Sequence, residues 1–367
     1  MKIALVHDYL QVYGGAERVL EELHALYPQA PVYVAFFDQK ALGIHAQKFA
    51  GWDIRQSFIT KIPLYKIIYS PLRLFAPKFF SAFDMSEYDV ILSSSNMYFA
   101  KAIKKRTDAI HISYCHTPPR ALYGYTTQTN WKKNPIIRLV GTLINHYLRV
   151  VDYNVSQQVD YFIANSHEVQ KRIQKYYRKD STIIYPPVNV AEKLSTQKNS
   201  NADYYLYVGR LAFSKHPELA VKVANKLQLK LKVVGTGSMM DQLKQIAGET
   251  VELLGSVDDY NLNQVYQGAK GLIFPVKDED FGIVPVEAMG HAVPVIAHNS
   301  GGPKETVIDG VTGVLFDQLT EAGLTKAIQR FTKIKFDPQQ IHQQALKFST
   351  PRFKKEIANF VTTHRPE

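Results

Sequence analysis

Short apolar runs alternate with helical patterns along most of the chain, and this alternation is the feature that most restricts the fold. Runs such as VILSSS at 90–95 and VELLG at 251–255 have the length and composition of buried strands. Helical patterns follow them, as in HEVQKRIQKYY at 167–177. The apolar residues of the strand runs do not alternate strictly with polar ones, which is typical of parallel strands covered on both faces. The chain is therefore predicted to be an α/β protein.

The strand and helix alternation is interrupted once and then restarts. The interruption, YPPVNVAEKLSTQKNSNAD, begins at Tyr185, and 367 residues exceed what one ordinary core accommodates. Two doubly wound, Rossmann-like domains are expected, which would face a cleft at the carboxyl ends of their strands. The predicted parts are an N-terminal domain over 1–190, a linker over 191–201, a C-terminal domain over 202–345, and a last helix within 346–367 that could pack back on the first domain.

Composition and hydropathy favour a cytoplasmic protein. Hydrophobic residues make up 46% of the chain and charged residues 21%, as in ordinary globular proteins. Cys115 is the only cysteine, which excludes an intramolecular disulfide. The apolar N-terminus lacks the longer core and cleavage site of a signal peptide. No uncharged apolar run approaches the roughly 18 residues of a spanning helix. We expect a soluble protein that is at most peripheral on the inner face of the cell membrane.

The positive charge is concentrated in the first half of the chain. Residues 61–150 carry 13 basic and 4 acidic side chains, which is most of the net charge of +11. Between Ile54 and Phe83, aromatic residues interleave with cations and no acid occurs; the cations are Arg55, Lys61, Lys66, Arg73 and Lys78. This pattern suits an anionic membrane surface. An alternative stays equally open, in which the aromatic residues belong to the core and the cations are solvated.

Several cofactor motifs are missing from the sequence. Gly235 and Gly237 follow a predicted strand, but the third glycine of a dinucleotide fingerprint would fall at Met240. No phosphate-binding loop of the G-x-x-x-x-G-K-[ST] type occurs, and the histidines lack the Cys/His spacing of a zinc site. Neither a nicotinamide or flavin cofactor nor a metal is predicted.

One stretch combines acidic side chains with a helix start suited to anions. Gly282 follows a predicted strand, and a helix begins at Ile283. The unpaired N–H groups and positive dipole end of such a helix suit a diphosphate. Glu279 and Glu287 could accept hydrogen bonds from the hydroxyls of a sugar and of ribose. Alternatively, Glu279 is solvated and Glu287 is an acid in the first turns of a helix.

Cations and glycines follow other predicted strands. Arg210 and Lys215 lie on the loop after the strand at 204–208, where they could bind phosphate oxygens. Considered alone, two such cations are more often surface charges. Gly14 and Gly15 precede the helix AERVLEEL and form another helix start that could receive an anion.

These motifs together resemble a known family. GRLAFSK at 209–215, the E-x7-E spacing of Glu279 and Glu287, the continuation EAMGHAVPVIAHNSGGPKE and the later DGVTGVLF are similar to the retaining glycosyltransferases of family 4, which have the GT-B fold. The resemblance covers essentially the whole chain. SYCHTPPRALYGY and IIYPPV further resemble bacterial enzymes that add mannose or related sugars to surface polysaccharide or lipid-linked oligosaccharide.

The resemblance implies roles for individual residues. The catalytic set would be Glu279 on the sugar hydroxyls, Arg210 and Lys215 on the leaving diphosphate, and His116 near the donor sugar, although a lone histidine is more often a plain polar residue. Asp8 and Arg120 could be acceptor-side or structural. The donor-binding set would be Gly14, Gly15, Gly235, Gly237, Val257, Phe281, Gly282, Ile283, Val284 and Glu287.

The implied reaction is transfer of a sugar, best matched by mannose from GDP-mannose, to a glycan or lipid-linked hydroxyl with retained configuration. A UDP-sugar is the alternative donor. Asp278 and Asp280 flank Glu279, but their neighbours match the GT-B motif and not a metal-binding pair, so metal-independent stabilisation of the leaving group is expected. A GT-B epimerase or phosphorylase is a rival, without a cofactor lysine motif to support it. A nucleic-acid-binding protein would not explain Arg210, Lys215 and the two glutamates, so no nucleic acid is expected.

Overall fold

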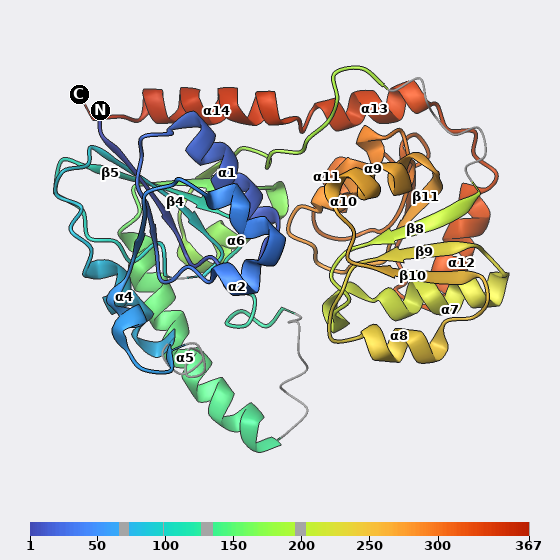
Figure 1. Cartoon of the computed structure of the whole chain (residues 1–367), viewed down its shortest axis with the longest axis horizontal. Helices are drawn as coiled ribbons and strands as arrows, with labels where there is room; N and C mark the ends of the chain where they lie inside the picture. The colour runs from blue at the N-terminus through green and yellow to red at the C-terminus, as the bar shows by residue number, and fades with distance from the viewer. Residues whose placement is uncertain (66–72, 98, 126–134, 195–202, 367) are drawn as a thin grey trace. The chain divides into compact units, whose positions relative to one another are not determined.

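The computed structural model describes residues 1–65, 73–97, 99–125, 135–194 and 203–366, which form two compact units (Figure 1). The first unit contains the described residues of 1–125, 135–187 and 350–366, and the second contains those of 188–349. Each unit has its own parallel sheet, which confirms the α/β class and the two doubly wound domains. The first unit gives way to the second after Pro187, whereas the sequence suggested a linker over 191–201.

The sheet of the first unit has seven parallel strands in the order β3-β2-β1-β4-β5-β6-β7. Their bounds are β1 Ile3–His7, β2 Val32–Val34, β3 Ile54–Gln56, β4 Val90–Ser95, β5 Ile110–Cys115, β6 Tyr161–Ala164 and β7 Ser181–Ile183. The order reverses at β1, which pairs with β2 on one side and β4 on the other. Alternate residues of β1 enter different cores, since Leu5 belongs to one apolar cluster and Ala4 and Val6 to another. Both faces of the sheet are therefore buried, as the unbroken apolar runs predict.

Helices cover both faces of this sheet. They are α1 Gly15–Leu26, α2 Gln39–Leu42, α4 Ala76–Ser81, α5 Pro135–Gln157, α6 His167–Tyr177 and α14 Thr350–Thr363, with short 3-10 helices at Gly43–Phe49, Phe58–Lys61 and Arg73–Phe75. Helices α1 and α14 pack on the face of the sheet that carries Leu5. Helices α4 and α5 contribute to the core on the opposite face, which carries Ala4 and Val6. The last helix, α14, packs within the first unit, where Phe353 lies edge-on to Tyr114 of β5.

The second unit contains six parallel strands in the order β10-β9-β8-β11-β12-β13. Their bounds are β8 Tyr204–Val208, β9 Leu231–Val234, β10 Val251–Gly255, β11 Ala269–Phe274, β12 Val295–His298 and β13 Gly313–Phe316. The helices are α7 Pro217–Leu227, α8 Met240–Ile246, α9 Asp259–Gln267, α10 Ile283–Gly290, α11 Pro303–Thr306, α12 Glu321–Phe331 and α13 Pro338–Leu346. The order reverses between β8 and β11, and ligands of open α/β sheets bind at the carboxyl ends of strands at such a point.

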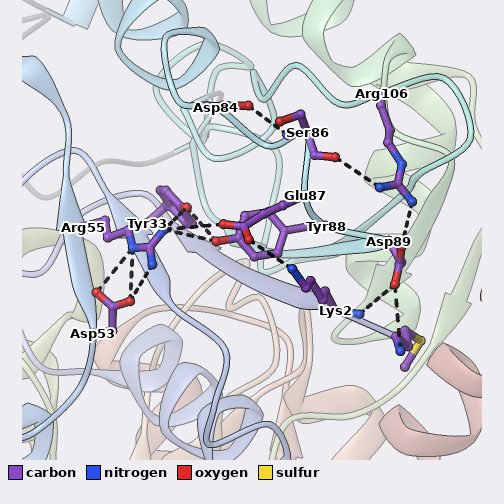
Figure 2. Close-up of polar contacts among 11 residues, drawn as sticks. Lys2, Tyr33, Asp53, Arg55, Asp84, Ser86, Glu87, Tyr88, Asp89 and Arg106 are labelled. Atoms are coloured by element: carbon purple, nitrogen blue, oxygen red, sulfur yellow. Dashed lines mark hydrogen bonds and ion pairs between the residues drawn. The ribbon is translucent and has the colours of Figure 1, made fainter.

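A polar network occupies the amino ends of the first unit's strands (Figure 2). Arg55 donates to both carboxylate oxygens of Asp53 and, over 2.7 Å and 3.1 Å, to the hydroxyls of Tyr33 and Tyr88. Arg106 pairs with Asp89 at 2.6 Å, and Asp89 also accepts from the backbone N–H of Lys2. Arg55 is therefore neutralised within the protein, whereas Lys61 and Lys78 have no acidic partner among the described side chains.

The aromatic residues of the basic stretch are divided between core and surface. Phe79 and Phe80 of α4 are buried in the core beneath Val6, whereas Phe75 is exposed. Lys61 and Lys78 are exposed, and Lys66 lies outside the described residues. No described helix has both the length and the apolarity required to cross a membrane.

Candidate active site

The carboxyl edge of the second sheet brings Lys215 and Glu279 together. Lys215 lies at the end of a 3-10 turn, Phe213–Lys215, after β8, and Glu279 lies on the loop after β11. The Nζ atom of Lys215 donates a hydrogen bond to Oε2 of Glu279, and both side chains are only partly buried. The contact links the loops of β8 and β11, which flank the reversal of strand order. Two residues separated by 64 positions thus meet at the predicted ligand site.

Glycines lock the loop that carries Glu279. A Cβ atom on Gly302 would lie 2.0 Å from the carbonyl oxygen of Phe281, and one on Gly301 would lie 2.0 Å from that of Glu279. The N–H of Gly302 donates to the Glu279 carbonyl over 2.8 Å. Only glycine permits this approach of two backbones. Gly301 and Gly302 therefore let the loop that carries Glu279 pack directly against their backbone. This contact holds the Glu279 backbone in place.

The loops after β8 and β9 meet in the same way. A Cβ atom on Gly235 would lie 1.9 Å from the carbonyl oxygen of Gly209, and one on Gly237 would lie 2.3 Å from that of Leu211. Both glycines also have positive φ, at 135° and 158°. These two glycines, predicted to lie near a nucleotide base, thus have a packing role that the sequence did not reveal. Val257, also predicted to lie there, is half-buried just beyond β10.

Helix α10 begins without a side-chain cap. Gly282 at its N-cap has φ 85°, and no acidic residue lies in its first turn. Ile283 and Val284 are partly exposed, while Phe281 is buried against Phe348. An uncapped helix start keeps its N–H groups available to an anion. The backbone N–H groups at the start of α10 are therefore left available to the predicted anion.

Glu287 lies on α10, and its carboxylate is held by a side chain of helix α9. Its Oε2 atom accepts a hydrogen bond from the hydroxyl of Tyr266, over 3.0 Å, and the Tyr266 ring stacks on His291. Tyr266 belongs to α9 and is fully buried, so the carboxylate of Glu287 is oriented by the core. Arg210, by contrast, is exposed on the loop after β8.

His298 and Ser300 support the same loop and were not predicted from the sequence. The N–H of Asp278 donates to Oγ of Ser300 over 2.9 Å, and Ser300 contacts Nδ1 of His298 at 2.8 Å. Nε2 of His298 lies 3.1 Å from the carbonyl of Asp317. Because burial lowers the pKa of His298, we assign a neutral ring that donates from Nε2 and accepts from Ser300. This fixes the residue directly before Glu279.

The first unit places His116 at the carboxyl edge of its own sheet. His116 follows β5 and is 8% exposed, and its Nε2 atom lies 2.8 Å from Oγ of Ser94 on β4. Burial, followed by the nearby His7, lowers the pKa of His116 to about 3, so the ring is neutral at physiological pH. Its carbonyl accepts from Nδ2 of Asn165 over 2.8 Å. Asn165, directly after β6, therefore supports the His116 backbone.

The start of α1 differs from that of α10. The N–H of Gly14 donates to Oε2 of Glu17 over 2.8 Å, so this amide is already used within the protein. The carboxylate of Glu17 also places a negative charge in the first turn of α1. Gly15 is the first residue of the helix. The predicted anion site at Gly14 and Gly15 is therefore less receptive than the one at Gly282.

Asp8 has the structural role that the sequence left open. Its buried carboxylate accepts from the backbone N–H groups of Asn96, Met97 and Ala100, at 2.8 to 3.0 Å. These bonds shape the loop after β4. Arg120 is partly exposed and lies over the ring of Tyr125. Over the described ranges, no group of three or more His, Cys, Asp or Glu side chains is arranged to hold a metal ion.

Comparison with protein families decides the identity. The model of "Glycosyl transferases group 1" matches residues 189–348, and that of "Glycosyltransferase Family 4" matches residues 13–192. The chain belongs to the family 4, group 1 glycosyltransferases. It is an enzyme of the glycosyltransferase class, and its two matched regions correspond to the second and first units.

Individual relatives of this glycosyltransferase agree. An α-1,3/1,6-mannosyltransferase of Dictyostelium discoideum is 24% identical over 86% of each chain. The crystal structure of Anabaena HepE in complex with UDP has a TM-score of 0.69 and 19% identity, and covers 99% of this chain and 100% of that one. A sucrose-phosphate synthase of Thermosynechococcus elongatus has a TM-score of 0.70 and 18% identity over 99% of each chain. These structures confirm the GT-B fold.

The glycosyltransferase thus presents its predicted site residues in two groups, one in each unit. In the second unit, Lys215 and Glu279 are in contact, and Gly282 opens the helix that carries Glu287. In the first unit, His116 lies at the carboxyl edge of the sheet. The supporting residues, His298 and Ser300 among them, escaped sequence analysis because a histidine or serine carries no motif of its own.

Proposed function

We propose that this glycosyltransferase moves a sugar from a nucleotide diphosphate to a hydroxyl of a glycan or lipid-linked acceptor, with retained configuration. The contact between Lys215 and Glu279 carries the proposal. It brings a cation and a carboxylate to the carboxyl edge of the sheet, at the reversal of strand order where ligands of such sheets bind. A diphosphate needs the cation, and the hydroxyls of a sugar need the carboxylate.

Each group has a distinct part in the proposed reaction. Lys215, Arg210 and the N-terminus of α10 would stabilise the charge that develops on the departing diphosphate. Glu279 would accept hydrogen bonds from the donor sugar, and Glu287 from the ribose. With the diphosphate charge met by cations and backbone amides, the reaction would proceed without a metal. A front-face route, with the phosphate oxygen as base, requires no covalent nucleophile on the protein.

Mannose from GDP-mannose is the proposed donor. Support comes from the mannosyltransferase among the relatives. The competing donors are UDP-sugars, because HepE structures contain UDP, UDP and glucose, or UDP-glucose.

A panel of GDP- and UDP-sugars tests this proposal, with nucleotide release and product formation measured in the presence of glycan acceptors. Lys215→Ala should lower turnover by roughly 10²–10³-fold, the usual loss for one group that stabilises a developing oxyanion. Glu279→Gln should weaken use of the donor sugar. Lys222→Ala is the control, since Lys222 is half-exposed on α7 and pairs only with Glu321 among described residues. Wild-type turnover in both site variants would contradict the assigned roles.

Metal independence is tested in the same assay. Activity in excess EDTA should match activity in magnesium, because Lys215 and Arg210 supply the positive charge that a metal would otherwise provide. Loss of turnover in EDTA, with recovery after a divalent ion is added, would contradict this part of the proposal.

We further propose that the first unit attaches to an anionic membrane surface through α5. Six large apolar side chains are exposed over about three turns of this helix: Leu139, Val140, Leu143, Ile144, Tyr147 and Val150. Leu139 and Leu143 are 66% and 67% exposed. In Figure 1 the first turns of α5 extend beyond the rest of the unit. Such an amphipathic helix, held at one end, is suited to the interface of a bilayer.

Charge favours a membrane as the occupant of this surface. The acids of residues 61–150 are Asp84, Glu87, Asp89 and Asp108, and the first three lie in the amino-edge network of Figure 2. Asp108 pairs with Arg106 in the same region. The apolar turns of α5 contain Arg138 and Arg149 and no acid, and Lys61 and Lys78 are exposed in the same unit. A second copy of the chain would place these cations against one another.

Flotation with phosphatidylcholine vesicles, with and without phosphatidylglycerol, tests the attachment. Binding should rise with the anionic lipid and fall with salt. Because a buried leucine contributes about 1.5–3 kcal/mol, the L139Q/L143Q variant should bind more than about tenfold more weakly. Ile44→Gln, at an apolar residue 72% exposed elsewhere in the unit, should bind like wild type. Equal binding of both variants, or dimer formation through α5 in sedimentation, would contradict the proposal.

A further inference from the structure

A chain of buried polar contacts connects His116 with the start of α1. Oγ of Ser94 lies 2.8 Å from Nε2 of His116 and 3.1 Å from Nδ1 of His7. On the other side of His7, Nε2 lies 3.5 Å from Oε1 of Glu17. The contacts cross β5, β4, β1 and α1, and none of His7, Ser94 and Glu17 has a part in the proposed reaction. All four side chains are at least nine-tenths buried.

Ser94 forces a choice between the two histidines. Its hydroxyl carries one proton, and the two ring nitrogens are the contacts seen for it among the described residues, so it donates to one of them and accepts from the other. If the proton goes to Nδ1 of His7, then Nε2 of His116 must be the donor. If it goes to His116, then His7 must donate from Nδ1. The protonation of one histidine therefore determines the tautomer of the other.

Glu17 decides which arrangement forms. Its Oε2 atom accepts the N–H of Gly14, and its Oε1 atom faces Nε2 of His7. A carboxylate oxygen facing a bare nitrogen lone pair at this distance would be repelled, and burial leaves little water to screen the two groups. Nε2 of His7 therefore carries the proton. With its proton on Nε2, the His7 ring accepts from Ser94 at Nδ1, and Ser94 accepts from Nε2 of His116.

We propose that Glu17 is a positioning residue that, through His7 and Ser94, holds His116 as the tautomer with its proton on Nε2. The Nδ1 atom of His116 is then an unprotonated acceptor, with no hydrogen-bond partner among the described residues. It is free to accept a hydrogen bond from a hydroxyl of the donor sugar. This last step rests on the proposed function, whereas the arrangement of protons in the chain does not.

Glu17→Gln provides a sharp test because it keeps the shape of the side chain. The N–H of Gly14 can pair only with an oxygen, so the amide oxygen should turn toward Gly14 and the NH2 group toward His7. His7 would then accept at Nε2 and carry its proton on Nδ1. Ser94 would accept from His7 and donate to His116, which would move its proton to Nδ1.

Nitrogen-15 NMR of the histidine rings in the full chain measures this directly, without donor or acceptor. Signals lost in His7→Gln and His116→Gln identify the two rings. In the wild-type protein both rings should be protonated at Nε2, and in E17Q both at Nδ1. Adding Ser94→Ala to E17Q should abolish the movement of the His116 proton from Nε2 to Nδ1. Glu21→Gln, on the same helix but in contact with Tyr13 and Lys48, should leave both rings unchanged.

The possible results separate the proposal from the proposed function. An unchanged His116 tautomer in E17Q, or a His7 ring protonated at both nitrogens in the wild type, would overturn the positioning role. If the tautomer switches, the donor KM should rise about tenfold with little change in kcat, since one hydrogen bond to the sugar is lost. A tautomer switch with an unchanged donor KM would overturn the contact between His116 and the sugar, while the proposed sugar transfer by Lys215 and Glu279 would stand.

Discussion

At the scale of single residues, Gly302 shows how a glycine can serve a site without approaching a ligand. Its φ of −58° is ordinary, so glycine is required here for a steric reason. A Cβ atom would lie 2.0 Å from the carbonyl oxygen of Phe281. Gly302→Ala should displace the loop that carries Glu279, and a displacement near 1 Å can reduce turnover by about 10²-fold. Steady-state kinetics with the preferred donor measures this effect.

The matched control for Gly302 is Gly290, at the end of α10. A Cβ atom there would lie 3.4 Å from a side-chain atom of Val190, an ordinary contact. Gly290→Ala should therefore keep nearly full activity. Equal losses in the two variants would show that the loop is sensitive to any added methyl group and not to the Phe281 contact.

At the scale of elements, one buried ion pair holds the C-terminal half of α5. Lys101 donates to Asp152 of α5 over 2.7 Å and to Tyr177 of α6 over 2.6 Å, and both charged side chains are fully buried. Asp152→Ala would leave the ammonium of Lys101 buried without its partner, so we expect a loss of about 3–5 kcal/mol in the free energy of unfolding. Denaturant unfolding measures this loss.

Two comparisons isolate the buried charge as the cause. Lys101→Met with Asp152→Leu should recover most of the lost stability, because no unpaired charge is left inside. Asp203→Ala breaks the exposed pair with Lys230 and should leave the free energy of unfolding nearly unchanged. If the double variant were as unstable as Asp152→Ala, packing and not charge would hold α5.

At the scale of the whole molecule, buried histidines predict sensitivity of the first unit to acid. Burial lowers the pKa of His111 to about 4 and that of His116 to about 3. An unfolded chain protonates histidine near pH 6.5, whereas the folded unit stays unprotonated until much lower pH. Stability from these groups is therefore complete above pH 6.5 and is lost as the pH falls toward 4. Calorimetry between pH 7 and 5 should show a falling Tm.

A His111→Gln variant tests the origin of this loss. It removes one of the two histidines whose pKa burial lowers in this way, so the decline of Tm with falling pH should become shallower, whatever its Tm at pH 7. An unchanged slope would assign the acid sensitivity to other residues. The two units have separate cores, so the transition of the first unit is the one to follow.

Much of the architecture is encoded locally and could be predicted from the sequence. The strands at 90–95 and 251–255 and the helices at 167–177 and 217–227 lie where apolar spacing, Ser166 and Pro217 indicate. The three-residue strands β2, β3 and β7 and the long helix α5 were missed. Three residues give too short a pattern to recognise, and the apolar residues of α5 are spread between a buried and an exposed face, which weakens the expected periodicity.

Short-range spacing and motifs therefore encode the class of fold, the family, and the loops on which the candidate site residues lie. Which of these residues meet depends on the tertiary structure. Lys215 and Glu279 are 64 positions apart, and His7 and Ser94 are 87 apart. It likewise paired Arg55 with Tyr33 and Tyr88, and turned Gly301 and Gly302 toward the protein's own backbone. These contacts depend on which strands become neighbours in the sheet. That choice reflects the burial of both sheet faces and the matching of distant surfaces, neither of which is written in any short segment.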